Sequence, residues 1–156
     1  MLYFAYGSNL DWNQMRKRCP SAKFCGMAVL RGHRLAFTRL SRKRGCGAAD
    51  VIPAAGSNVW GVVYEITERE VEFLDKSEGY RPGRETNSYI RKECQVAMEG
   101  DDDSPMAVVS YFAHRENNPP LPNQEYKVQI LGGARFWHLP EEYIINTLEA
   151  IEVSMG

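Results

Sequence analysis

The amino-acid sequence predicts an α+β fold in which a small mixed or closed β-sheet is flanked by helices. Segments rich in β-branched and aromatic residues occur along most of the chain. Helix signals fall between them irregularly, without the β–α–β alternation that is typical of a parallel sheet. The length of 156 residues fits one unit of ordinary size, so we predict a single domain over residues 1–156.

The first elements are predicted from short apolar runs and the residues that interrupt them. Residues 2–6 form an aromatic run, which indicates a buried strand that ends at Gly7. Residues 11–18 suit a short helix with Ser8 or Asn9 as its N-terminal cap.

Three further strands are expected in the next part of the chain. Residues 24–31 and 33–38 are predicted as two strands joined near Gly32. Residues 48–52 are predicted as another strand, which ends at Pro53.

The clearest strand signal covers residues 58–66, which are mostly β-branched or aromatic. Residues 67–70, Thr-Glu-Arg-Glu, form a capping box that starts a helix, and Gly79 ends it. Residues 88–98 and 106–113 are predicted as two more strands, which brings the expected total to six or seven.

Two short helices are predicted near the end of the chain, at residues 123–131 and 140–150. Gly132 and Gly133 are expected to terminate the first of them, and Pro140 suits the first turn of the second.

Composition is typical of a globular protein, with 44% hydrophobic and 25% charged residues. No apolar run is long enough to span a membrane, and residues 1–6 are too short for the core of a signal peptide. We therefore expect a cytoplasmic protein with no membrane partner. The three histidines are scattered, and the cysteines form no ligand pairs, which predicts reduced thiols and no metal site. The four cysteines are Cys19, Cys25, Cys46 and Cys94.

Charge is unevenly distributed, although the net charge of −1 gives no overall field that favours nucleic acid. Residues 31–44 hold six arginines and lysines, and residues 99–103 form an acidic turn. The basic segment has two interpretations: a solvated loop, or a surface that attracts an anionic substrate or partner.

The segment from Tyr6 to Leu10 combines the end of a strand, a glycine and the start of a helix. Amide groups at such a point lack backbone partners and can bind a carboxylate or a phosphate without a cationic side chain. Taken alone, the same five residues are also typical of an ordinary capped turn.

Glu78 is the strongest candidate for a catalytic carboxylate. In the helix that begins at Thr67, Val71, Leu74 and Glu78 share one face, so Glu78 lies at the edge of an apolar surface. Partial burial and the negative end of the helix dipole both raise the pKa of a carboxyl group, as a general base near neutral pH requires. A capping or surface-paired glutamate is the alternative interpretation of the same position.

Motifs for other chemistry are absent from the sequence. It contains no Walker loop, no Gly-x-Gly-x-x-Gly fingerprint and no Gly-x-Ser-x-Gly elbow around Ser8. Nucleotide binding and serine-hydrolase chemistry are therefore disfavoured, and no cofactor is predicted.

Taken in order, the motifs resemble the γ-glutamylcyclotransferase family, which includes the plant avirulence-induced AIG2-like proteins. The segments that carry the resemblance are residues 3–10, 59–64 and 74–79, Tyr126 in the helix before residues 133–134, and residues 139–143. They cover nearly the whole chain, and the first and third are the diagnostic ones.

The resemblance implies a compact mixed β-barrel with peripheral helices and an enzyme that acts on a small-molecule γ-glutamyl substrate. Such an enzyme cyclises the γ-glutamyl group to 5-oxoproline and releases an amino acid or an amine. The resemblance assigns the acid/base role to Glu78. Closing a five-membered ring needs only orientation and proton transfer, so we expect no metal or cofactor. The resemblance also assigns substrate binding to Tyr6, Gly7, Ser8, Asn9 and Leu10, and to Tyr89 and Tyr126 as enclosing tyrosines.

Two other functions stay open at this point. One is a non-catalytic module that binds a γ-glutamyl or carboxylate ligand on the same fold. The other is an RNA-associated protein that uses the basic segment 31–44, which the net charge of −1 disfavours. Residues 39–44 and the 45–47 turn match no family pattern, so the leaving-group side of the pocket is not predicted.

Overall fold

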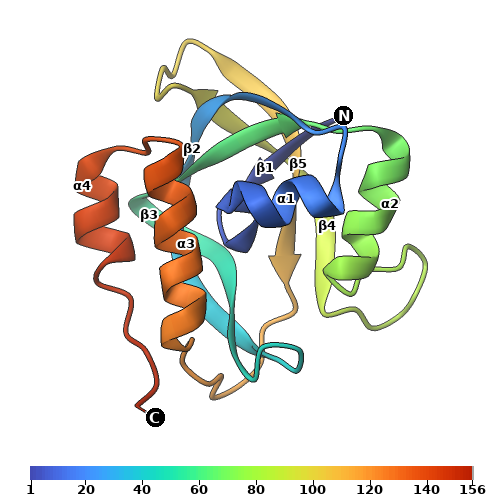
Figure 1. Cartoon of the computed structure of the whole chain (residues 1–156), viewed down its shortest axis with the longest axis vertical. Helices are drawn as coiled ribbons and strands as arrows, with labels where there is room; N and C mark the ends of the chain where they lie inside the picture. The colour runs from blue at the N-terminus through green and yellow to red at the C-terminus, as the bar shows by residue number, and fades with distance from the viewer. Residues whose placement is uncertain (156) are drawn as a thin grey trace.

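The computed structural model describes residues 1–155 and consists of a closed β-barrel surrounded by helices (Figure 1). The strands are β1 (Leu2–Ala5), β2 (Lys23–Ser41), β3 (Cys46–Glu65), β4 (Tyr89–Met98) and β5 (Pro105–Ala113). They follow the order β1-β3-β2-β4-β5 around the barrel. The barrel closes where β1 pairs in parallel with β5, Tyr3 opposite Val109, while the other pairs are antiparallel. The predicted small mixed barrel is confirmed.

The strand count differs from the prediction because β2 and β3 are long, bent strands. Each was expected as two separate strands, interrupted at Gly32 and Pro53. In the structure Gly32 adopts a φ of 71°, and the register shifts between Arg31 and His33, which pairs with Pro53. A bulge tolerates a proline and a left-handed residue within a strand, so the pairing continues through the bend.

The tip of the β2–β3 hairpin positions half of the arginines and lysines of the basic segment. Ser41 pairs with Cys46, and the amide of Gly45 donates a 2.7 Å hydrogen bond to the carbonyl of Ser41. Gly45 has a φ of 69°, in the left-handed region that glycine adopts at little cost. The tight turn therefore holds residues 42–44 at the end of a long strand pair.

The first two helices frame one end of the barrel. α1 (Trp12–Arg18) is capped by Asp11, whose side chain accepts a hydrogen bond from the amide of Asn13. The predicted cap at Ser8 or Asn9 is wrong, because Ser8–Leu10 forms its own 3₁₀ turn before α1 begins. α2 (Glu68–Ser77) has the predicted capping box and ends before Gly79, which has a φ of 69°.

α3 (Gln124–Phe136) runs through the two glycines that were expected to end it. Gly133 lies against the 3₁₀ turn: a Cβ atom there would lie 2.4 Å from the carbonyl carbon of Leu10. The glycine therefore permits close packing of α3 on the turn and does not break the helix. α4 (Glu141–Tyr143) continues into a π-helical turn, Ile144–Leu148.

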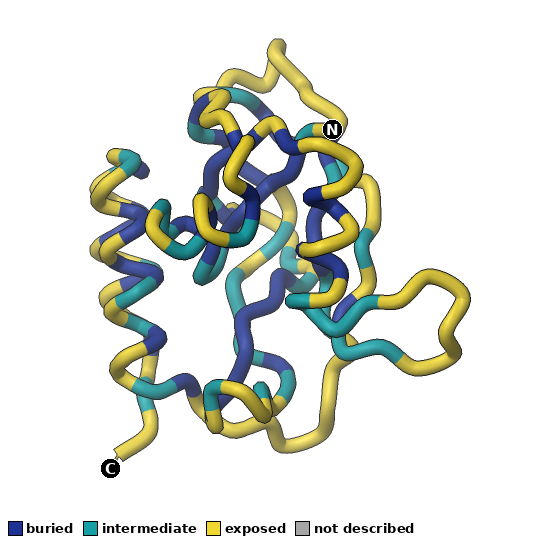
Figure 2. The backbone as a smooth tube through the Cα atoms, turned by 45° about the vertical axis from the view of Figure 1, so that its right-hand side comes forward, coloured by how far each residue is buried: buried dark blue, intermediate teal, exposed yellow. Residues whose placement is uncertain are grey.

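The core fills the barrel and the inner faces of the helices. Figure 2 shows buried residues along the strands and as alternating bands on the helices, while the loops are exposed. Phe4, Leu10 and Tyr64 are among the largest fully buried side chains. Within residues 1–155, none of the helices has the length and apolar character needed to cross a membrane.

Candidate active site

Two connected cavities lie at the end of the barrel next to the Tyr6–Leu10 loop. The inner pocket has a volume of about 40 Å³ and the outer cleft about 900 Å³. Ser8, Glu78, Tyr89 and Tyr126 line both cavities, so these four residues form the junction between them. An inner volume of this size has room for a few water-sized groups.

The loop from Tyr6 to Leu10 forms one wall of the inner pocket. Tyr6, Gly7, Ser8 and Asn9 line it, and within the described residues the amides of Gly7, Ser8 and Asn9 donate no backbone hydrogen bond. Leu10 lies elsewhere: its side chain is fully buried in the core and lines neither cavity. Four of the five predicted loop residues are therefore brought to the pocket.

A polar network fixes the shape of this loop. The amide nitrogen of the Asn9 side chain donates a 2.9 Å hydrogen bond to the hydroxyl of Tyr3. Its side-chain oxygen accepts hydrogen bonds from Gln14 and Arg18, and its backbone carbonyl accepts one from Tyr64. Because Asn9 is buried and both its side-chain amide and its backbone carbonyl are hydrogen-bonded, these contacts hold the loop in one conformation.

The glycine at position 7 keeps the space beside the pocket open. A Cβ atom there would lie 3.3 Å from the Cβ of Ala49 and 3.9 Å from the hydroxyl oxygen of Tyr126. A larger side chain would therefore occupy the space between the loop and Tyr126. Without a side chain at this position, the backbone of Gly7 itself lines the inner pocket.

Glu78 occupies the C-terminal cap position of α2, at the junction of the two cavities. Its side chain is 20% exposed and lies 3.9 Å from the guanidinium of Arg18. Burial raises the pKa of the Glu78 carboxyl, while the charges of Arg18, Arg44 and Lys43 lower it. The pKa of Glu78 therefore lies above its ordinary value, which suits a carboxylate that accepts and returns a proton.

Tyr89 and Tyr126 are both held by the backbone of Ala49. The Tyr89 hydroxyl donates to the Ala49 carbonyl, and the Ala49 amide donates a 3.1 Å hydrogen bond to the Tyr126 hydroxyl. Burial raises the pKa of Tyr126 to about 12, so its hydroxyl stays protonated near neutral pH. Among the described residues nothing accepts that proton, which leaves the Tyr126 hydroxyl able to donate to a ligand.

Two further tyrosines of the inner pocket, Tyr3 and Tyr111, were missed by sequence reasoning. Tyr3 lies in the first motif, but its position in a short aromatic strand is equally typical of a core residue. Tyr111 lies in β5, where nothing in the local sequence marks a site. Its carbonyl accepts a 2.6 Å hydrogen bond from the Tyr6 hydroxyl.

Asp75 anchors the helix that carries Glu78. This buried carboxylate accepts a 2.6 Å hydrogen bond from the Tyr111 hydroxyl and lies 2.7 Å from a guanidinium nitrogen of Arg91. Asp75 precedes Glu78 by three residues, so these bonds join the last turn of α2 to strands β4 and β5. The network limits how far Glu78 can move from the pocket.

Within residues 1–155, no three histidine, cysteine, aspartate or glutamate side chains gather closely enough to hold a metal ion. The four cysteines are all free in this part of the chain. That the activity needs neither a metal nor a cofactor stays a prediction.

Similarity to known proteins agrees with this arrangement. Residues 3–128 match the family model of gamma-glutamyl cyclotransferase, AIG2-like. The gamma-glutamylcyclotransferases of Mus musculus and Homo sapiens are each 36% identical over 157 residues, which cover 97% of this chain and 78% of theirs. A solved gamma-glutamyl cyclotransferase structure superposes with a TM-score of 0.88 at 32% identity, covering 99% of this chain and 89% of that one.

The family model spans both the loop and Glu78, and the structural match includes the barrel that brings them together. The two most diagnostic motifs of the sequence thus meet at one cavity junction in a fold shared with these relatives. The chain therefore belongs to the gamma-glutamyl cyclotransferase, AIG2-like family.

Proposed function

We propose that this protein is a γ-glutamylcyclotransferase that converts a small γ-glutamyl compound to 5-oxoproline and a free amine or amino acid. Its family membership and its named relatives support this activity. The observation that carries the assignment of residues is the position of Glu78. Its carboxylate lines both cavities, between the unpaired amides of the loop and the open cleft.

In this proposal the inner pocket holds the α-carboxylate of the γ-glutamyl group. The amides of Gly7, Ser8 and Asn9 supply hydrogen bonds to it. The side chain of the substrate then passes between Tyr89 and Tyr126, and the leaving group extends into the outer cleft. The scissile amide therefore lies at the junction, beside Glu78.

The chemistry needs only orientation and proton transfer. Glu78 takes a proton from the α-ammonium group, and the freed amine attacks the γ-carbonyl carbon to form the five-membered ring. The bond from that carbon to the leaving nitrogen then breaks as Glu78 returns the proton to the departing amine. The ring nitrogen gives up its second proton through the ionised Glu78 carboxylate to the released amine, which leaves as an ammonium ion. Each step conserves atoms and charge without water, a metal or a covalent enzyme intermediate.

Negative charge develops on the γ-carbonyl oxygen during the attack. The unused hydroxyl proton of Tyr126 and the loop amides are the donors available at the junction. Donors fixed in advance, in a site that is largely buried, stabilise such an oxyanion more than water does. We therefore assign Tyr126 a second role besides enclosing the substrate.

The test is to incubate the protein with a panel of γ-glutamyl amino acids, γ-glutamyl amines and glutathione and to measure 5-oxoproline. Release from at least one compound, lowered about 10²–10⁴-fold by Glu78→Gln, supports the proposal. Binding of the panel without any release of 5-oxoproline would favour the non-catalytic binding module. If the protein neither binds any compound of the panel nor releases 5-oxoproline, both functions are refuted.

We further propose that the single domain acts in the cytoplasm, in glutathione-related metabolism, and uses neither nucleic acid nor membrane as a partner. Four free cysteines within residues 1–155 agree with a reducing compartment. Fractionation of cells that express a tagged protein measures the location directly, and recovery in the membrane or secreted fraction would contradict it.

A further inference from the structure

The outer cleft carries a concentration of positive charge that the whole protein does not share. The net charge of the chain is −1, yet seven of its 19 arginines and lysines line this one cleft, beside three glutamates. The cationic residues are Lys17, Arg18, Arg39, Arg42, Lys43, Arg44 and Lys76. A cleft of one sign of charge concentrates ligands of the opposite sign.

Two of these cations are occupied by carboxylates of the cleft itself. Arg18 lies 3.9 Å from Glu78, and Arg39 lies 3.8 Å from Glu116. Glu116 also accepts a 2.7 Å hydrogen bond from the amide of Leu40. These pairs account for two of the three glutamates. In the described part of the chain they leave most of the positive charge of the cleft without a carboxylate partner.

The remaining five cations have no carboxylate within 4.0 Å among the described residues; they are Lys17, Arg42, Lys43, Arg44 and Lys76. They come from both sides of the cleft. Arg42, Lys43 and Arg44 form the tip of the β2–β3 hairpin, and the two other lysines lie on α1 and α2. Figure 1 shows this turn below α1 and the C-terminal end of α2.

Arg44 is the most firmly positioned of the five. Its guanidinium carbon lies 4.3 Å from the centre of the Tyr126 ring, and one guanidinium nitrogen donates a 2.9 Å hydrogen bond to Gln129. A second nitrogen lies 3.4 Å from the side-chain oxygen of Gln14. All three partners are neutral, so the charge of Arg44 is fixed beside the inner pocket and is not compensated.

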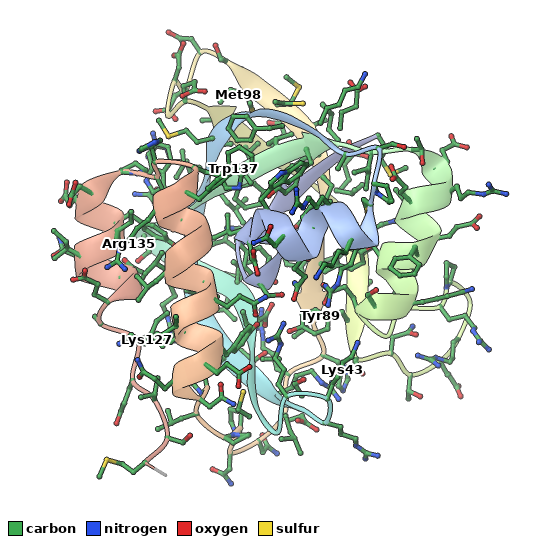
Figure 3. The ribbon with its side chains drawn as sticks, viewed as in Figure 1. Lys43, Tyr89, Met98, Lys127, Arg135 and Trp137 are labelled. Carbon is green, nitrogen blue, oxygen red and sulfur yellow. The ribbon has the colours of Figure 1, made fainter. Side chains whose placement is uncertain are left out.

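Lys43 and Arg42 extend the positive surface outward from Arg44. Both side chains are exposed, and the charge of Lys43 is close enough to lower the pKa of Glu78. Figure 3 shows Lys43 near Tyr89, which lines the same cleft at the junction with the inner pocket. A leaving group that starts beside Glu78 therefore meets Arg44 first and Lys43 and Arg42 beyond it.

A leaving amino acid with a neutral side chain offers this surface only one carboxylate. Arg44 is sufficient to bind it, which leaves Arg42 and Lys43 without a role. We propose that the preferred leaving group is an acidic amino acid, whose second carboxylate is bound by the hairpin tip through Arg42 and Lys43. The inference rests on the proposed cyclotransferase function and narrows its substrate class. It also assigns a role to the basic segment between positions 39 and 44.

The experiment compares two nearly isosteric substrates, γ-glutamylglutamate and γ-glutamylglutamine, which differ by one negative charge. We expect kcat/KM to be about tenfold higher for γ-glutamylglutamate, a difference of about 1.4 kcal/mol. The preference should shrink as salt is raised, because exposed charges are screened. γ-Glutamyllysine should be the poorest substrate of the three.

The double variant Arg42→Gln/Lys43→Met removes the hairpin charges and should bring the ratio of the two kcat/KM values to about one. Arg34→Gln/Lys23→Met is its matched control. Arg34 and Lys23 are exposed and lie outside both cavities, and the two substitutions remove the same amount of positive charge. The control should keep the preference unchanged. Calorimetric binding of both dipeptides to Glu78→Gln gives a readout that does not depend on turnover.

The outcomes separate the two proposals. Equal kcat/KM for the two dipeptides in the native enzyme, or a preference that survives in the hairpin variant, overturns the acidic-substrate proposal and leaves the cyclotransferase function intact. Loss of the preference in the control variant also overturns it, because a general charge effect would then explain the result. If none of these dipeptides yields 5-oxoproline while another compound of the γ-glutamyl panel does, this inference alone fails; if no compound of the panel does, the cyclotransferase function fails as well.

Discussion

Replacing Glu78 by glutamine tests the centre of the proposed mechanism. Glutamine keeps the length of the side chain but can neither accept nor return a proton. No other carboxylate lines the inner pocket in the described part of the chain, so nothing nearby can substitute for Glu78. We expect turnover to fall by about 10²–10⁴-fold, the usual contribution of a positioned general base, or about 2.7–5.4 kcal/mol of barrier.

The same variant has an opposite consequence for stability. Burial raises the pKa of Glu78 in the folded protein, so the ionised form destabilises the fold relative to the neutral form. A raised carboxyl pKa stabilises the folded state at acidic pH, and that contribution is lost as pH rises through the folded pKa. Glu78→Gln should therefore unfold at an equal or higher temperature than the native protein at pH 7, with no gain below the unfolded pKa.

The pH dependence of the native enzyme follows from the same carboxyl. As a base, Glu78 must be ionised, so activity should rise with pH through the pKa of Glu78, which burial raises above the ordinary value of a glutamate. The residual activity of Glu78→Gln should lack this rise. Measurement of 5-oxoproline release from pH 4 to 8 on both proteins gives the comparison.

Glu72→Gln is the matched control, because Glu72 is exposed on the same helix and lines neither cavity. It should change neither turnover nor the pH profile. Near-normal turnover in Glu78→Gln together with a lower melting temperature would identify Glu78 as a structural glutamate and would refute the mechanism.

Three other predictions follow from the described contacts. Gly133→Ala places a Cβ against the Leu10 carbonyl carbon, and we expect about 1–3 kcal/mol of destabilisation and reduced turnover, measured by thermal unfolding and 5-oxoproline release. Asp75→Asn removes the negative charge that pairs with Arg91 and that accepts a hydrogen bond from the Tyr111 hydroxyl. We expect a lower melting temperature and lower turnover, and unchanged values of both would contradict the anchoring role. Treatment with a chelator should leave activity unchanged, since ring closure needs only proton transfer; loss that a divalent ion restores would contradict this.

The sequence was most informative where a feature depends on neighbouring residues. The capping box at Thr67 and the end of α2 near Gly79 were predicted because side chains a few positions apart determine them. The strand breaks at Gly32 and Pro53 were predicted wrongly because a long partner strand continues the pairing through a bulge. The same limit applies to Gly133, where a tertiary contact with Leu10 decides what the glycine does.

The two halves of the candidate site also differ in how far they could be predicted from the sequence. The loop and Glu78 each belong to a short motif, so a linear pattern indicates the half that we propose binds the γ-glutamyl group. The cations of the outer cleft come from α1, α2, the end of β2 and the β2–β3 turn, and only the folded barrel brings them together. A leaving-group site assembled from distant exposed residues can change by single charge substitutions without disturbing the catalytic half. Selectivity among leaving groups should therefore respond to the hairpin tip, while the rate of ring closure responds to Glu78 and the loop.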